Sequence, residues 1–144
     1  MIEHDTVRLL RECDAGAKMG IDAINDVWDY VKNEEFLEKL DECRRQHLHI
    51  EGEINEQLAR FKDEGKDPPF VAKEMSRMKC DMKLMMNKTD NTVADLITDG
   101  CNMGVKSLSK YLNEYEAADE RSKELAKRLI RMEELLAKNI RCYL

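Results

Sequence analysis

The chain has 144 residues, of which 38% are charged and 42% are hydrophobic, with a formal net charge of −6. This length predicts a single domain over residues 1–144 that is large enough to bury a hydrophobic core. Only two prolines and six glycines are present, which is typical of a helical protein and excludes a β-sandwich or a disordered chain. The acidic balance argues against binding to nucleic acid or to an anionic membrane, because both need clustered Lys and Arg.

The N-terminal sequence lacks the basic segment and apolar stretch of a signal peptide. No apolar run approaches the roughly 18 residues that indicate a membrane span. We therefore expect a cytoplasmic protein without a membrane partner. The five cysteines have no C-x-x-C spacing, so they predict neither a disulfide framework nor a zinc site.

Two helices are predicted in the first half of the chain. Asp5 is expected to be the N-cap of the first helix, and Asn33 that of the second. Apolar or small residues at steps of three and four define the buried face of the first helix: Leu10, Cys13, Ala17, Ile21, Ile24, Trp28 and Val31. The second helix has a similar row: Phe36, Leu40, Cys43, His47, Ile50, Ile54, Leu58 and Phe61. The tight connection between them makes the two helices antiparallel neighbours.

The clearest break in the chain is the segment 63–69, which contains both prolines. It predicts a long crossover connection rather than a domain boundary. The helical periodicity that follows would form a helix of about 70 Å if it were continuous. We therefore expect a split or kinked third arm, with an extra helix near 70–87 and a bundle helix near 90–115. A last helix is predicted to begin at Asp119.

Two glycine pairs lie at matching places in the two halves. Gly16 and Gly20 match Gly100 and Gly104 at a spacing of 84 residues, and the following helices match at 85. Glycine inside a helix destabilises it by about 1 kcal/mol relative to alanine. Two matching pairs therefore indicate that packing between helices requires the glycines. The pattern predicts two similar helical hairpins whose helices cross closely at these glycines.

A hairpin, a long crossover and a second similar hairpin form the layout of ferritin-like bundles. The stretch 97–112, which contains Gly-Cys-Asn-Met-Gly, and the C-terminal stretch 131–144 also resemble uncharacterised small bacterial proteins of that superfamily, found in anaerobic Firmicutes. The resemblance implies an all-α, antiparallel four-helix bundle. It also implies two irons in the core, held by a carboxylate from each of two helices and a Glu-x-x-His from each of the other two.

The chain departs from that metal motif at several positions. His47 lies on the apolar row, but Arg44 stands where the motif has a glutamate. The last helix has no histidine, and the repeat places Met132 opposite His47, with Glu133 beside it. An incomplete centre for Fe, Mn or Zn is still conceivable, and its candidate ligands are Asp14, His47, Glu51, Asp99 and Glu133.

The same residues also have a structural interpretation. A histidine on an apolar face is usually hydrogen-bonded to a neighbour, and Glu51, one turn after His47, could provide that bond. Asp14 is expected to pair with Lys18, Arg44 or His47. Such a polar cluster fixes the register of a bundle without any metal.

These observations favour a non-enzymatic structural or interaction protein with a degenerate metal site and no cofactor. The alternative is a metal-binding protein of the di-iron type, with an oxidoreductase or metal-storage role. The expected helix near 70–87 has an apolar face that must be covered, which predicts a homo-oligomer, most simply a dimer. That face is formed by Met75, Met78, Met82, Met85 and Met86.

Overall fold

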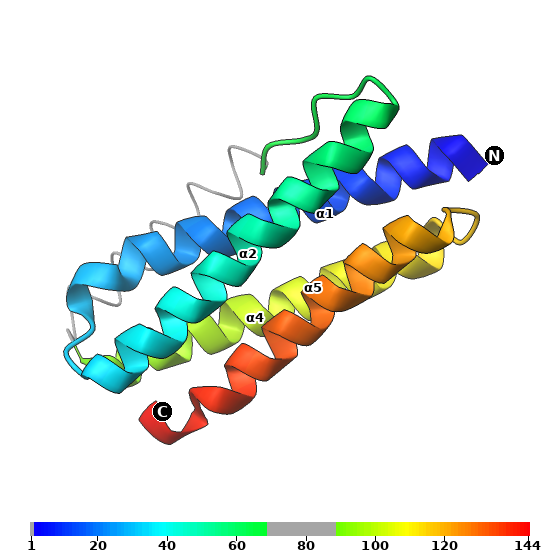
Figure 1. Ribbon diagram of the computed structural model, residues 1–144. Helices are drawn as coiled ribbons and strands as arrows, with labels where there is room; N and C mark the ends of the chain where they lie inside the picture. The colour runs from blue at the N-terminus through cyan, green and yellow to red at the C-terminus, as the bar shows by residue number, and fades with distance from the viewer. Residues whose placement is uncertain (1, 69–88) are drawn as a thin grey trace.

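The computed structural model describes residues 2–68 and 89–144, and the regular secondary structure in these two ranges is entirely helical. The long helices pack lengthwise into a bundle (Figure 1): α1 (Ile2–Val27), α2 (Glu34–Arg60), α4 (Asp90–Glu114) and α5 (Glu120–Asn139). Short 3-10 turns follow two of them: η1 (Trp28–Tyr30) and η2 (Arg141–Tyr143). The helix expected near 70–87, with its methionine face, lies outside the described residues.

The prediction of Asn33 as an N-cap is confirmed, and Asp119, the predicted start of the last helix, is the N-cap of α5. The Asn33 side chain accepts a hydrogen bond from the backbone N–H of Phe36 at 3.0 Å, and that of Asp119 accepts one from Ser122 at 2.8 Å. The prediction for Asp5 is wrong, because α1 already begins three residues before it. The Asp5 carboxylate instead accepts a backbone N–H from the α4–α5 connection at 3.1 Å.

Each hairpin turn is held by the first helix of the other hairpin. The Asp90 carboxylate at the start of α4 accepts hydrogen bonds from the backbone N–H groups of Lys32 at 2.9 Å and Asn33 at 3.1 Å. At the opposite end, the Thr6 hydroxyl of α1 accepts one from the backbone N–H of Asp119 at 2.8 Å. Because each of these two helices starts beside the turn that follows the other, α1 and α4 run in opposite directions (Figure 1).

Replacing Asp90 by Ala should lower the free energy of unfolding by about 1–2 kcal/mol, because two backbone N–H groups lose their acceptor and the α4 N-terminus loses a negative charge. Asp90→Asn, which keeps one acceptor oxygen, should lose about half as much. Urea denaturation of the three proteins measures both values. Equal stability of wild type and Asp90→Ala would show that this contact does not hold the turn.

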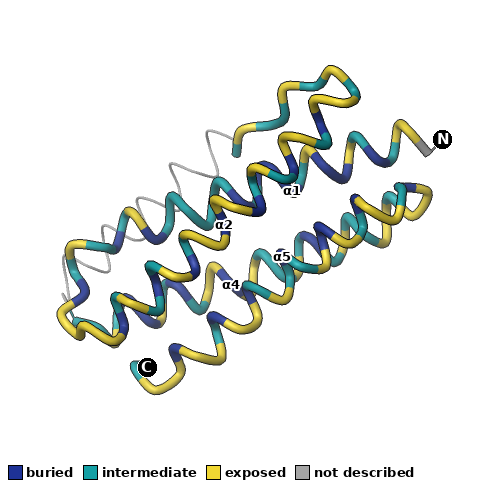
Figure 2. The backbone as a smooth tube through the Cα atoms, viewed as in Figure 1, coloured by how far each residue is buried: buried dark blue, intermediate teal, exposed yellow. Residues whose placement is uncertain are grey.

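Buried residues lie along the inner faces of the helices (Figure 2). They form two apolar clusters, one toward each end of the bundle. Phe36 and Ile140 belong to one cluster, and Leu10 and Leu125 to the other. The predicted row of α2 is confirmed except for its last member, Phe61, which is only partly buried. None of the helices in the described ranges is long and apolar enough to cross a membrane.

Burial shows the register of the two hairpins relative to each other. Buried residues of α1 and α4 match at a spacing of 84: Leu9 with Val93, Leu10 with Ala94, Cys13 with Ile97, Ala17 with Cys101 and Ile24 with Leu108. Those of α2 and of α5 with its C-cap Ile140 match at 86: Phe36 with Ser122, Leu40 with Ala126, Cys43 with Leu129, His47 with Glu133, Ile50 with Leu136 and Ile54 with Ile140. The second turn is thus longer by two residues, not by the one predicted, and the counterpart of His47 is Glu133 rather than Met132.

Candidate functional site

A buried polar pair lies at the boundary between the two apolar clusters. His47 is 1% exposed and Glu133 is 8% exposed, and Nε2 of the histidine lies 2.5 Å from Oε1 of the glutamate. On the other side of the ring, Nδ1 lies 2.8 Å from the carbonyl oxygen of Cys43 and 3.4 Å from its sulfur. A carbonyl oxygen can only accept, so Nδ1 donates to it. An imidazolium, which donates from both nitrogens, satisfies both partners.

The surroundings of the pair favour the charged form of the histidine. Burial disfavours the imidazolium, but the hydrogen bonds with Cys43 and Glu133 outweigh it and raise the pKa of His47 to about 10. Near neutral pH the pair is therefore an imidazolium and a carboxylate. Burial, followed by the charge of Glu133, also raises the pKa of the Cys101 thiol, which stays neutral beside the pair.

The four glycines of the two glycine pairs differ in how closely they approach this site. A Cβ atom on Gly20 would lie 2.7 Å from the Nε2 and Cδ2 atoms of the His47 ring, closer than side chains pack. A Cβ on Gly16 or Gly104 would make ordinary side-chain contacts at 3.7–3.8 Å, and one on Gly100 would meet nothing within 4 Å. The prediction that all four glycines mark a close helix crossing is wrong. Among these four glycines, only Gly20 has no room for a Cβ atom, because the His47 ring occupies that space.

Asp14 on α1 is fully buried. Its carboxylate binds the connection that follows α2. Its Oδ2 atom accepts hydrogen bonds from Lys18 Nζ at 2.9 Å and from the backbone N–H of Lys66 at 3.0 Å. Of its three predicted partners, Lys18 is therefore the one observed. Gly65 has φ +87°, and a Cβ there would collide with the Asp14 carboxylate. Asp14 thus holds a tight turn that only glycine fits.

The remaining candidate ligands, Glu51 and Asp99, do not hydrogen-bond to either ring nitrogen of His47. Glu51 is partly buried, and burial, followed by the charge of Asp14, raises its pKa. It is not the partner of His47, which bonds to Glu133 instead. Asp99 is exposed on α4. Within the two described ranges, no three His, Cys, Asp or Glu side chains are grouped so that they could hold a metal ion.

The order of groups at the pair is thiol, imidazole and carboxylate, which is also the order in cysteine nucleophile sites. Here Nδ1 of His47 already donates to the Cys43 carbonyl, so it has no lone pair with which to take the proton of the thiol. The Cys43 side chain is 5% exposed and belongs to an apolar cluster. The chemical consequence of the arrangement is a closed charge pair that joins α2 to α5.

No protein-family model, curated protein or solved structure matches the chain. The resemblance to ferritin-like bundles therefore stays a prediction.

Sequence reasoning missed the direct contact between His47 and Glu133. The signal that could have found it is the spacing of the buried leucines on α5, since Leu129 and Leu136 are seven residues apart. Steps of three and four allow either Met132 or Glu133 between them. The repeat at 85 residues favours Met132, whereas the structure buries Glu133.

Proposed function

We propose that this protein is a non-enzymatic structural or interaction protein with a ferritin-like layout, in which a buried ion pair takes the place of a metal centre. One observation carries the proposal: both ring nitrogens of His47 are engaged inside the protein, by the Cys43 carbonyl and the Glu133 carboxylate. A metal needs the lone pair of a deprotonated nitrogen. Neither nitrogen offers one in this arrangement.

The residues at the motif positions do not fit a di-iron centre. Arg44, in place of the motif glutamate, lies over the Trp28 ring, 4.2 Å from its centroid. The carboxylate that α1 would provide, Asp14, is held through Oδ2 by Lys18 and by the backbone N–H of Lys66, while its Oδ1 atom is buried and has no hydrogen-bond partner within the described residues. The opposite directions of α1 and α4 support the ferritin-like layout, while this chemistry speaks against the ferritin-like reaction.

Metal content tests the proposal. Protein purified from cells grown with added Fe, Mn and Zn should contain less than about 0.1 metal ion per chain, and its melting temperature should not change when any of these ions is added, because no bound ion stabilises the folded state. The His47→Ala variant should show the same metal content as wild type. Stoichiometric Fe, Mn or Zn that is lost in His47→Ala would overturn the proposal in favour of the metal-binding alternative.

A further inference from the structure

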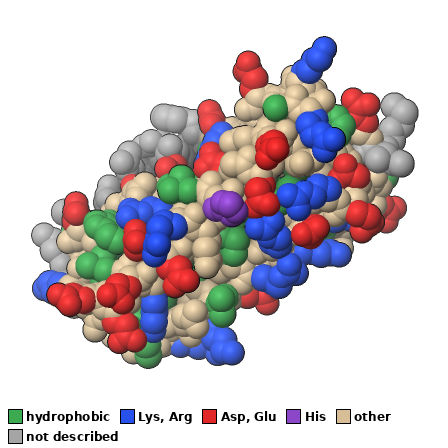
Figure 3. All heavy atoms as spheres, viewed as in Figure 1, with side chains coloured by type: hydrophobic (Ala, Val, Ile, Leu, Met, Phe, Trp, Pro, Cys, Tyr) green, Lys and Arg blue, Asp and Glu red, His purple; other side chains and the backbone are tan. Residues whose placement is uncertain are grey.

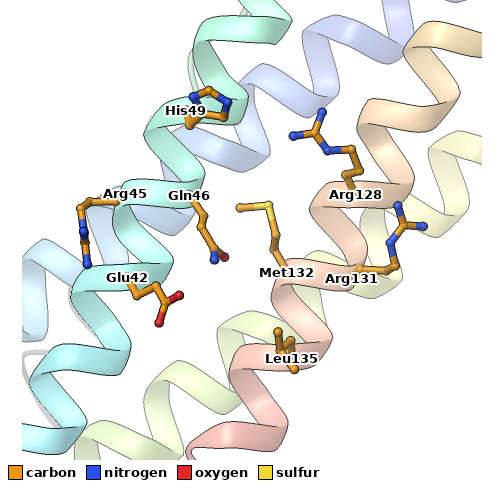
Figure 4. Close-up of a pocket in the computed structure, with 8 residues that line it drawn as sticks. All are labelled: Glu42, Arg45, Gln46, His49, Arg128, Arg131, Met132 and Leu135. Atoms are coloured by element: carbon orange, nitrogen blue, oxygen red, sulfur yellow. The ribbon is translucent and has the colours of Figure 1, made fainter.

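A groove of about 620 Å³ runs along the surface between α2 and α5 (Figure 4). Its floor is apolar, since Met132 reaches from α5 toward Gln46 of α2, and Leu135 lies one turn further along. Leu135 is 52% exposed, which is unusual for a leucine that serves only the core. A smaller hollow continues the groove as far as Lys39. We call this surface the α2/α5 groove.

The charge of the groove is opposite to that of the chain. Three arginines line it, namely Arg45, Arg128 and Arg131, against the single carboxylate of Glu42, although the chain as a whole carries −6. Lys and Arg side chains lie near the histidine on this face, interspersed with Asp and Glu (Figure 3). An occupant that complements both properties presents apolar side chains flanked by carboxylates.

The arginines are not equally available to a partner. Arg128 is bound by Glu53 at 2.8 Å, and Arg45 lies 3.2 Å from Asp41. Arg131 is exposed and forms no ion pair with any residue of the described ranges. It is therefore the cation on the rim that a carboxylate can reach without first breaking an existing pair.

The groove has the shape of a seat for a helix. Its walls are two helices, and from Lys39 to His49 it extends about 15 Å along α2, the length of nearly three helical turns. Amphipathic helices bind in such grooves through apolar residues at steps of three and four. Methionine and arginine are also enriched where proteins meet.

We propose that the α2/α5 groove binds an acidic amphipathic helix of another protein, with its apolar side chains over Met132 and Leu135 and a carboxylate against Arg131. This inference rests on the proposed role as an interaction protein and names the chemistry of its partner. The chain's own segment 69–88 does not have that chemistry, because its sequence contains five Lys and Arg against two Asp and Glu.

The probe is a fluorescein-labelled synthetic helix of about four turns. It has leucines at steps of three and four, with glutamates beside them. Fluorescence anisotropy should show saturable binding with a dissociation constant on the order of tens of micromolar. Leu135→Glu and Arg131→Glu should each weaken binding at least about tenfold. Met103→Glu, at a residue that is 63% exposed on α4, and Lys110→Glu should bind like wild type.

The same helix with lysines in place of its glutamates should not bind. Equal affinity for both peptides, no saturation below about 1 mM, or binding that the groove variants leave unchanged would overturn the proposal. If light scattering shows a dimer that Leu135→Glu dissociates, and the peptide does not bind, the occupant is a second copy and the proposal fails. If the protein contains no metal and the peptide does not bind, only the groove proposal fails. If the protein contains a bound metal, the proposed function fails whether or not the peptide binds.

Discussion

Glu133→Met should lower the free energy of unfolding by about 3–5 kcal/mol at pH 7, because it removes one partner of a buried ion pair. His47→Leu together with Glu133→Met should regain most of this loss, since replacing both buried charges by apolar side chains is often close to neutral. Urea unfolding of wild type, the two single variants and the double variant completes the cycle. A loss below about 1 kcal/mol in Glu133→Met would mean that the pair is not an ion pair in the folded protein.

The pH dependence of stability gives the same ion pair a second signature. The folded-state pKa of His47 is raised to about 10 from 6.5. The stability it contributes is therefore fully present below pH 6.5 and is lost as the pH rises toward 10. Wild type should lose up to about 1.4 kcal/mol per pH unit between pH 6.5 and 8.5 relative to the double variant.

The pH range of this experiment ends at 8.5 because ionisation of the cysteine thiols also affects stability at higher pH. Burial, followed by the neighbouring carboxylate charges, raises the pKa of Cys13 to about 12. Unfolded thiols ionise from about pH 8.5, so the thiols also reduce stability at higher pH. Parallel pH profiles of wild type and the double variant below pH 8.5 would contradict a charged His47.

Gly20→Ala should lower the free energy of unfolding by about 1–2 kcal/mol, although alanine is the better helix former by about 1 kcal/mol. The added Cβ would lie 2.7 Å from the His47 ring, which is held on both sides by hydrogen bonds and cannot move away without breaking one. Thermal unfolding followed by circular dichroism measures the change.

The bundle offers a matched control for that substitution. Gly100 is the counterpart of Gly16 in the other hairpin, and a Cβ there meets nothing within 4 Å, so Gly100→Ala should raise the free energy of unfolding by up to about 1 kcal/mol. In the His47→Ala background, Gly20→Ala should no longer cost stability, because the two positions are coupled through direct contact. A stabilising Gly20→Ala in wild type would show that the site has room to spare.

Much of the fold could be predicted because the sequence signals of a helix lie within the helix itself and at its ends. The row from Phe36 to Leu58 has the steps of three and four that a buried helix face requires, and it is buried as predicted. Asn33 is recognisable as a cap because its short side chain reaches the first free N–H groups of a helix. These signals need no knowledge of what lies across the bundle.

The site could be predicted only in part because its contacts join distant residues. Glu51 was the local candidate partner of His47, but the observed partner, Glu133, comes from α5, 86 residues along the chain. Finding it requires the length of a turn to within one residue, and composition does not give that length. Asp14 likewise serves a loop 52 residues away.

The charge state of His47 tests the account most directly. Nitrogen-15 NMR of protein purified from metal-supplemented cells reports at pH 8 whether each ring nitrogen carries a proton. The account predicts that both Nδ1 and Nε2 are protonated at this pH, which lies above the ordinary histidine pKa of about 6.5. A ring nitrogen that is unprotonated, or whose signal is shifted by a bound metal, would contradict the ion pair and the function derived from it.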